Sequence, residues 1–228
     1  MEGATEKDVS PPGERFRWML VFALRGDLRF ISHHDTLRLF RRALARADIP
    51  VRYSEGFNPH PKVMIPLPRP VGVASRDEAL VLETHRIIDP DQALQRLQEQ
   101  TPNDIEVISL RRMERGEQME PERVCYRLDL SDMNIDDLEA RVEKMLTAET
   151  IPIERKSPKS KVARQVDIRP YLVDLRAAGQ MVEFTLMVTG NGTAKPAEIA
   201  GALGYDPGSI NHRIERLEVQ WRSTPQRT

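Results

Sequence analysis

The apolar positions of the chain fall into short segments that predict alternating strands and helices. Residues 16–24 are almost continuously apolar and predict a buried strand, whereas apolar residues between positions 37 and 47 recur at helical spacing. Ser32, three residues before Asp35, predicts the N-cap of that helix, which we expect to end before Pro50. The chain therefore begins with a strand followed by a helix.

The remaining pattern predicts the same order of elements twice. In the first half, the pattern adds short extended pieces at 51–53 and 63–67, a strand at 78–88, a helix at 89–100 and a strand at 105–110. In the second half, it predicts a strand at 124–130, a helix at 134–147, extended chain from 151, strands at 166–175 and 181–188, a short helix at 196–203 and a strand at 214–221. Both halves give the order βαββαβ, so we expect an α+β protein of two tandem ferredoxin-like domains.

The expected domain organisation follows from these elements and from the composition between them. We expect a polar tail at 1–14, a first domain at 15–112, a charged linker at 113–123, a second domain at 124–222 and a tail at 223–228. Residues 155–164 hold five Lys and Arg and no acid, and they predict a flexible basic loop inside the second domain.

Charge is segregated along the chain although the formal net charge is only −1. Residues 15–76 carry 12 basic and 4 acidic residues, residues 77–150 carry 9 and 19, and residues 151–228 carry 12 and 8. The basic blocks indicate a surface for a polyanion, and the alternative is that opposite blocks pair within the fold.

The composition excludes several classes of protein. No segment approaches the roughly 20 apolar residues of a membrane span, and the N-terminus lacks the apolar region of a secretory signal, so we expect a cytoplasmic protein. Cys125 is the single cysteine, which excludes an intrachain disulfide and any cluster held by several cysteines.

The first candidate for chemistry is the run Ser32-His33-His34-Asp35 at the start of the predicted helix. Adjacent histidines point about 100° apart on a helix, so they are poorly placed to share a metal. A helix N-terminus favours an anion and lowers the pKa of a histidine. The alternative is simple capping, with the histidines at the surface.

The second candidate is the loop 56–62, in which His60 lies between two prolines that restrict its backbone. Tyr53 and Phe57 are suited to stacking on bases, Lys62 to a phosphate, and Asn58 to a polar contact in the same pocket. The alternative is a rigid turn with Phe57 in the core.

Basic side chains elsewhere predict phosphate contacts. On the outer face of the first helix and in the basic segment, the candidates are Arg38, Arg41, Arg42, Arg46, Lys159 and Lys161. A charged helix face is also typical of a surface that is merely solvated. Asp167 and Arg169 share a face of the strand predicted at 166–175, where they are placed to pair and to join the pocket.

Four stretches resemble the bacterial radical SAM-linked (radical SAM-associated) protein family over about residues 15–222: FISHHD (30–35), YSEGFNPHPK (53–62), VDIRPY (166–171) and the Gly/Pro-rich segment near 190–196. His33, Asp35 and His60 match the family pattern, whereas His34 stands where members usually carry an apolar residue. The resemblance implies a radical SAM partner that carries an iron–sulfur cluster and S-adenosylmethionine, with no cofactor in this chain. The doubled fold resembles CRISPR repeat-processing endoribonucleases and other RNA-binding proteins.

Three functional hypotheses follow, and each site hypothesis requires residues 32–35 and 54–62 to meet in one cleft. The first is an accessory that binds transfer or ribosomal RNA and presents it to the radical SAM enzyme. The second is a metal-independent endoribonuclease with His33 and His60 as base and acid. The third is a protein-interaction module without RNA, docking through the acidic residues 77–150. A metal held by His33, Asp35 and His60 is a further alternative, and the sequence specifies neither the RNA nor the oligomeric state.

Overall fold

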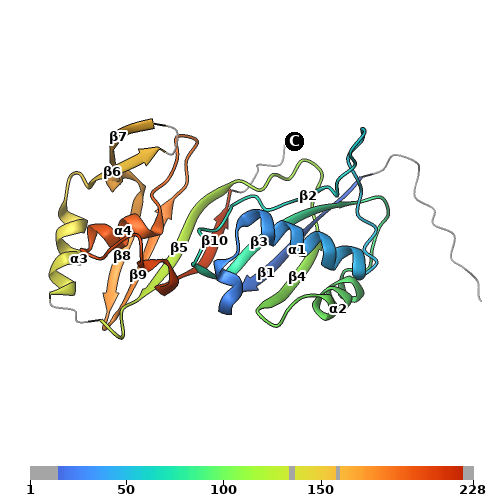
Figure 1. Cartoon of the computed structure of the whole chain (residues 1–228), viewed down its shortest axis with the longest axis horizontal. Coiled ribbons are helices and arrows are strands. Elements are labelled where there is room, and N and C mark those ends of the chain that lie inside the picture. The colour runs from blue at the N-terminus through green and yellow to red at the C-terminus, as the bar shows by residue number, and fades with distance from the viewer. Residues whose placement is uncertain (1–14, 134–136, 158–159, 223–228) are drawn as a thin grey trace, which may run out of the picture. The chain divides into compact units, whose positions relative to one another are not determined.

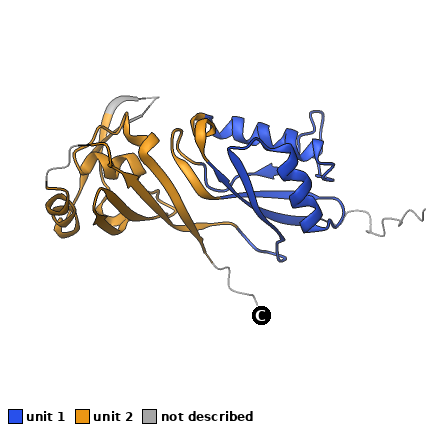
Figure 2. Cartoon of the chain, turned by 90° about the horizontal axis from the view of Figure 1, so that it is seen from below, with its two compact units in different colours: residues 1–24, 31–68, 78–118 blue, residues 25–30, 69–77, 119–228 orange. Residues whose placement is uncertain are grey.

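A computed structural model describes residues 15–133, 137–157 and 160–222, except for the side chains of 156–162. The chain has a mixed α+β fold, as predicted, and its contacts divide it into two compact units (Figure 2). Of the described residues, the first unit takes those within 15–24, 31–68 and 78–118, and the second takes those within 25–30, 69–77 and 119–222. Segments 25–30 and 69–77, which we expected in the first domain, therefore group with the second unit.

The first unit is built on strands and helices that Figure 1 labels along the chain. They are β1 (Phe16–Leu24), α1 (His33–Arg46), β2 (Val63–Met64), β3 (Ala74–Thr84), α2 (Pro90–Gln100) and β4 (Ile105–Arg112). β1 lies between β4 and β3, and β2 pairs with the other edge of β3. The pairs β1–β4 and β2–β3 are antiparallel. The predicted strand at 16–24 and the helix that ends at Gln100 are confirmed.

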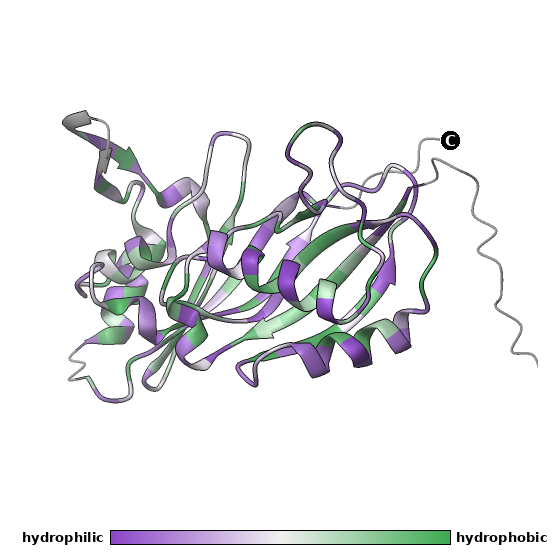
Figure 3. Ribbon diagram, turned by 45° about the vertical axis from the view of Figure 1, so that its right-hand side comes forward, coloured by the Kyte–Doolittle hydropathy of each residue, from purple (hydrophilic) through white to green (hydrophobic). Residues whose placement is uncertain are grey.

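The core of this unit lies between the sheet and its two helices. Alternate residues of β1 are buried, from Phe16 to Leu24, and the ring of Phe22 lies 4.5 Å from that of Phe40 on α1. α1 contacts α2, and α2 contacts β4. Figure 3 shows hydrophobic strands beneath the helices and hydrophilic positions along the outer sides of α1 and α2. The apolar stripe of each helix is thus removed from water, which stabilises both.

One end of the first unit is fastened at the last residue of β3. The indole Nε1 of Trp18 donates a buried hydrogen bond of 2.9 Å to the hydroxyl of Thr84, and Val51 forms a β-bridge with Thr84. Trp18 also lies opposite Arg112 in the register of β1 and β4. The start of β1, the segment after α1 and the end of β4 therefore lie together. α1 itself begins after the opposite end of β1.

The second unit holds the remaining elements. They are η1 (Gly26–Phe30), β5 (Pro121–Asp129), α3 (Leu138–Thr147), β6 (Pro152–Ser157), β7 (Ser160–Asp167), η2 (Arg169–Tyr171), β8 (Leu172–Ala178), β9 (Met181–Met187), α4 (Pro196–Ala202), η3 (Ile210–Arg213) and β10 (Ile214–Trp221). Its sheet has the order β10-β5-β9-β8. Ala74 and Ser75, at the start of β3, pair in parallel with β10, so this sheet is mixed.

Both units share one strand order when β6 and β7, which form a separate two-stranded sheet, are set aside. Counting the four strands of each unit in chain order, the fourth lies beside the first, the first beside the third, and the third beside the second. In each unit a helix follows the first strand and another follows the third.

Three expectations for the second unit need correction. The basic segment 155–164 is not a flexible loop, because β6 and β7 pair as an antiparallel hairpin with Arg155 opposite Arg164. The strand predicted at 166–175 is interrupted after Asp167, since Pro170 has no N–H to continue a ladder and the chain turns through η2. The helix predicted at 134–147 begins at Leu138, and residues 134–136 lie outside the described part.

Within the described ranges, no helix combines the length and the apolar character that a bilayer crossing requires.

Candidate functional site

The start of α1 is a closed capping arrangement. Ser32 is the N-cap, as predicted: its Oγ accepts the N–H of Asp35 at 3.2 Å and donates to Asp35 Oδ2 at 2.7 Å. Arg38 Nη1 donates to Asp35 Oδ1 at 3.0 Å. The hydrogen bond from the Ser32 hydroxyl, followed by the charge of Arg38, lowers the pKa of Asp35. Both carboxylate oxygens are thus engaged within the helix.

The two histidines lie side by side after this cap. The rings of His33 and His34 are 5.6 Å apart in an edge-on arrangement. Partial burial, and secondarily the charge of His34, lowers the pKa of His33. The neutral imidazole is favoured, as we expected, and burial is the main cause.

Loop 54–60 is a tight hairpin held by its own backbone. Tyr53 bridges to Pro61, and the N–H of Ser54 donates to His60 O at 2.9 Å. The Oγ of Ser54 lies 2.9 Å from His60 Nδ1 and accepts the His60 N–H at 3.1 Å. Gly56 has φ +119°, a conformation that only glycine adopts without strain. The His60 Nδ1 edge therefore faces the loop, while Nε2 has no partner among the described residues.

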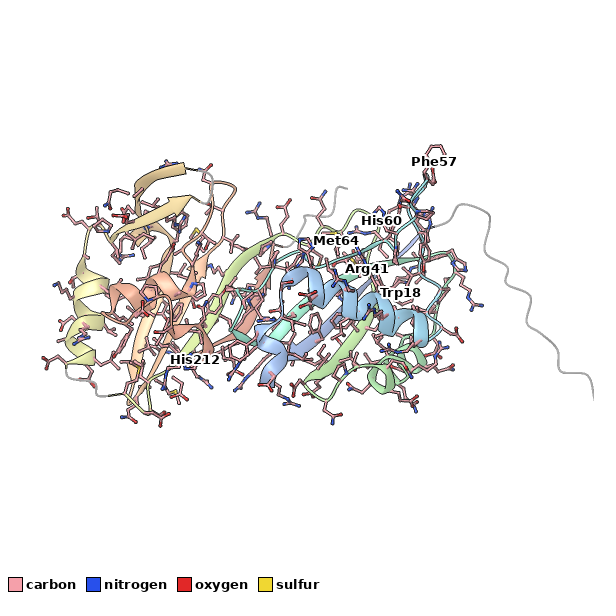
Figure 4. The ribbon with its side chains drawn as sticks, in the orientation of Figure 1. Trp18, Arg41, Phe57, His60, Met64 and His212 are labelled. Carbon is pink, nitrogen blue, oxygen red and sulfur yellow. The ribbon has the colours of Figure 1, made fainter. Side chains whose placement is uncertain are left out.

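Aromatic and sulfur side chains project from this loop and from its base. Phe57 is fully exposed at 105%, Tyr53 is 53% exposed and Met64 is 50% exposed. Figure 4 shows Phe57 at the outer tip of the loop, with His60 nearer the body of the unit. The alternative that Phe57 packs in the core is therefore wrong. An exposed aromatic ring on a fixed loop is available to stack on a ligand.

Two cations share one carboxylate beneath the loop. Lys62 Nζ lies 3.6 Å from Glu83 Oε2, and Arg52 Nη1 lies 3.9 Å from the same oxygen. All three side chains are half-buried. Sequence reasoning singled out Lys62 but missed Glu83, because a single acid in a strand reads as a solvated position. The cluster keeps a net positive charge next to the exposed rings.

The two motifs do not meet. His33 begins α1, whose 14 residues span about 20 Å. Loop 54–60 instead extends from the segment that bridges to Thr84, at the end of the unit that follows α1. No group of three or more His, Cys, Asp or Glu in the described ranges is placed to hold a metal, so His33, Asp35 and His60 form no such set. The shared cleft is therefore missing, both for the base-and-acid hypothesis and for an RNA pocket built from the two motifs together.

The arginines of α1 divide into two bonded and two available side chains. Arg38 pairs with Asp35, and Arg46 donates from Nε to Gln100 Oε1 at 3.2 Å and from Nη2 to Gln100 O at 2.8 Å. Arg41 is half-buried and its Nε lacks a hydrogen bond among the described residues, whereas Arg42 is exposed. Two of the four arginines that we expected to contact phosphate, Arg38 and Arg46, are therefore bonded within the first unit.

The candidates in the second unit have structural partners or lie outside the described residues. Lys159 and the side chain of Lys161 are outside them. Asp167 Oδ1 accepts the N–H groups of Ile151 and Arg169 at 2.7 and 3.0 Å. The Arg169 guanidinium donates instead to the carbonyls of Leu146, Ala148 and Leu172. These two residues fasten the end of α3 to the turn after β7, and they do not pair through their side chains.

The chain belongs to a bacterial family. The family of uncharacterized proteins conserved in bacteria designated DUF2344 matches residues 17–196. No curated protein matches the sequence.

Solved structures resemble the chain only weakly. An unknown protein from Galdieria sulphuraria is 10% identical with a TM-score of 0.28, over 92% of this chain and 100% of that one. The CRISPR endoribonuclease Cse3, bound to a 19 nt RNA, is 13% identical with a TM-score of 0.26, over 89% of this chain and 100% of that one. Likenesses of this size carry no conclusion about function.

Proposed function

We propose that the protein is an RNA-binding accessory that holds a single-stranded segment at loop 54–60 and presents it to a radical SAM enzyme. The observation that carries the proposal is a fully exposed Phe57 at the tip of a fixed loop, with the cationic cluster of Arg52 and Lys62 at the base of the same loop (Figure 4). Proteins that bind single strands combine exposed aromatic rings with nearby positive charge, because bases stack and phosphates pair.

The tandem ferredoxin-like arrangement is part of the same proposal. It is supported by the strand order and helix positions that the two units share. Small domains of this architecture are a common setting for RNA binding, which is an argument from fold alone. The site therefore rests on Phe57 and its neighbours and not on the fold.

The radical SAM partner is supported by the resemblance of the two motifs to the radical SAM-linked family. The partner would supply the iron–sulfur cluster and S-adenosylmethionine, because one cysteine does not ligate such a cluster. That cysteine, Cys125, is half-buried in β5, and burial raises the pKa of its thiol. We take transfer or ribosomal RNA as the cargo.

Binding of a labelled single-stranded oligoribonucleotide, followed by fluorescence anisotropy across a salt series, tests the proposal. We expect affinity to fall with salt, and Lys62→Gln to flatten the slope by about 0.7 for the one phosphate contact removed. Lys144→Gln, on the exposed side of α3, is the matched control and should leave the slope unchanged.

Two results would contradict the proposal. One is no binding to cellular RNA at low salt. The other is a complex with the radical SAM enzyme that survives nuclease treatment and contains no RNA, which would leave a protein-interaction module. Cleavage of the RNA by the pure protein, abolished by His60→Ala, would instead favour the endoribonuclease.

A further inference from the structure

The first unit contains a cavity of about 520 Å³ that the site above does not use. Its lining residues are Arg15, Arg17, Arg112, Met113, Glu114, Arg115 and Gly116. The lining contains four arginines and one acidic residue, so its formal excess is three positive charges. Arginine stays protonated at every physiological pH, so this charge is permanent.

The cavity forms because β1 and β4 run antiparallel. Their register places Trp18 opposite Arg112, and so brings residues 15–17 beside residues 112–116. The N–H of Met113 donates to Arg17 O at 2.8 Å, which continues the pairing past the end of β4. The chain then turns through Gly116, whose φ of +85° suits glycine.

Of the acids near the cavity, Glu114 lines it and offsets one of its positive charges. Glu117, the nearest acid after the turn, receives Arg111 Nη1 at 3.1 Å and Nη2 at 2.5 Å, and this pairing lowers its pKa. Arg17 Nη1 donates to the carbonyl of Glu117 at 2.6 Å.

The other three arginines of the lining retain free donors. The Arg112 guanidinium lies 4.8 Å over the ring of Phe16. Among the described residues, Arg15, Arg112 and Arg115 have no side-chain hydrogen bond and no acidic partner. Crowded cations of this kind repel one another until an anion enters.

We propose that this cavity binds a phosphate group with two negative charges, at the end of an RNA chain or on a free nucleotide. Guanidinium groups bind phosphate oxygens in pairs, and a lining with an excess of arginines favours a dianion over a group with one negative charge. The volume lies within the roughly 300–1,000 Å³ of ordinary ligand pockets, so the nucleoside that carries the phosphate also has room. The inference extends the proposed function, because loop 54–60 would hold bases while this cavity selects a chain end.

The test uses the full chain and one oligoribonucleotide sequence carrying a 5′-phosphate, a 3′-phosphate or neither. We expect one of the phosphorylated forms to bind about tenfold more tightly at pH 7.5, with the preference shrinking below the second pKa of the phosphate, about 6. Unlabelled nucleoside monophosphate and inorganic phosphate are added as competitors. Displacement by the nucleotide at lower concentration than by a phosphorylated chain end would identify the free nucleotide as the source.

Arg112→Gln/Arg115→Gln should remove the preference and leave the affinity for the unphosphorylated strand unchanged. The control Arg96→Gln/Arg123→Gln removes the same charge from exposed positions outside the cavity and should keep the preference. If the loss of the Phe16 contact unfolds the double variant, Arg115→Gln alone is measured, since its exposed side chain has no described partner.

The inference is overturned if all three strands bind equally and neither competitor displaces them, or if the cavity variant keeps the full preference. Its failure is distinguishable from that of the proposed function. Binding of a labelled nucleotide that the cavity variant loses, without binding of any RNA, would support the cavity and refute RNA binding.

Discussion

Replacing Phe57 with alanine tests RNA binding at loop 54–60 without removing a side chain that the fold buries. Because the side chain is fully exposed, its removal takes no buried surface from the fold, and we expect the free energy of unfolding to change by less than about 0.5 kcal/mol. Stacking on a base contributes about 1–3 kcal/mol. The variant should therefore bind single-stranded RNA roughly 5- to 150-fold more weakly.

Fluorescence anisotropy of the full chain with a labelled oligoribonucleotide measures this loss, and urea denaturation measures stability. Phe57→Tyr should retain most of the affinity, since the ring remains. Phe30 offers a matched control, because it is also exposed, at 51%, and lies beneath the Arg29 guanidinium in the second unit. Phe30→Ala should bind RNA as the wild type does. Equal losses in both variants, or none in Phe57→Ala, would refute the reasoning that places the bases at this loop.

Three further predictions concern stability. Trp18→Phe removes the buried hydrogen bond to Thr84 and should lower the free energy of unfolding by about 1–2 kcal/mol in urea denaturation; an unchanged midpoint would show that this bond does not fasten the end of the unit. Glu183 bonds to Arg127 and Arg176, which lowers its pKa below the ordinary 4.5, so it stabilises the fold above that value and the contribution disappears as pH falls through the lowered pKa. Glu183→Gln should therefore show a smaller loss of stability between pH 5 and pH 3 than the wild type, and an identical loss would count against the ion pairs. The His33 pKa is lowered in the folded protein, so the unfolded chain binds the proton at a higher pH than the folded chain does. The wild type should therefore lose stability as pH falls from 6.5. His33→Gln should lack this part of the pH dependence when urea midpoints are compared.

The sequence predicted those helices and strands whose caps and apolar runs are formed by neighbouring residues. The helix predicted at 89–100 is capped by Asp89, whose side chain accepts the N–H groups of Asp91 and Gln92. The strand at 16–24 was visible because its length and apolar run do not depend on distant residues. The sequence did not predict the hairpin of β6 and β7, because Arg155 and Arg164 pair through their backbones and their side-chain types give no strand pattern.

The arginine cavity shows the same limit at a candidate site. Arg15 and Arg17 read as the flank of a strand, Arg112 reads as the end of the first domain, and Arg115 reads as part of a linker without apolar periodicity. They become one site only through the register of β1 with β4, which joins residues almost a hundred positions apart. A period of two in both segments is compatible with many registers, so the sequence alone does not bring these residues together.

Whether a motif residue is available for a ligand depends on what the fold leaves unsatisfied. Both carboxylate oxygens of Asp35 accept hydrogen bonds, one from Ser32 and one from Arg38. The carboxylate of the first motif is therefore used in capping the helix. In the second motif the polar groups that fix the loop are those of Ser54 and the backbone, which leaves the Phe57 ring and one imidazole edge of His60 directed outward. The hydrogen bonds within the loop already fix its conformation. Binding a ligand there would therefore cost little additional conformational entropy. That difference, more than the residue types in the two motifs, shows capping at the first motif and supports the proposed RNA recognition at the second.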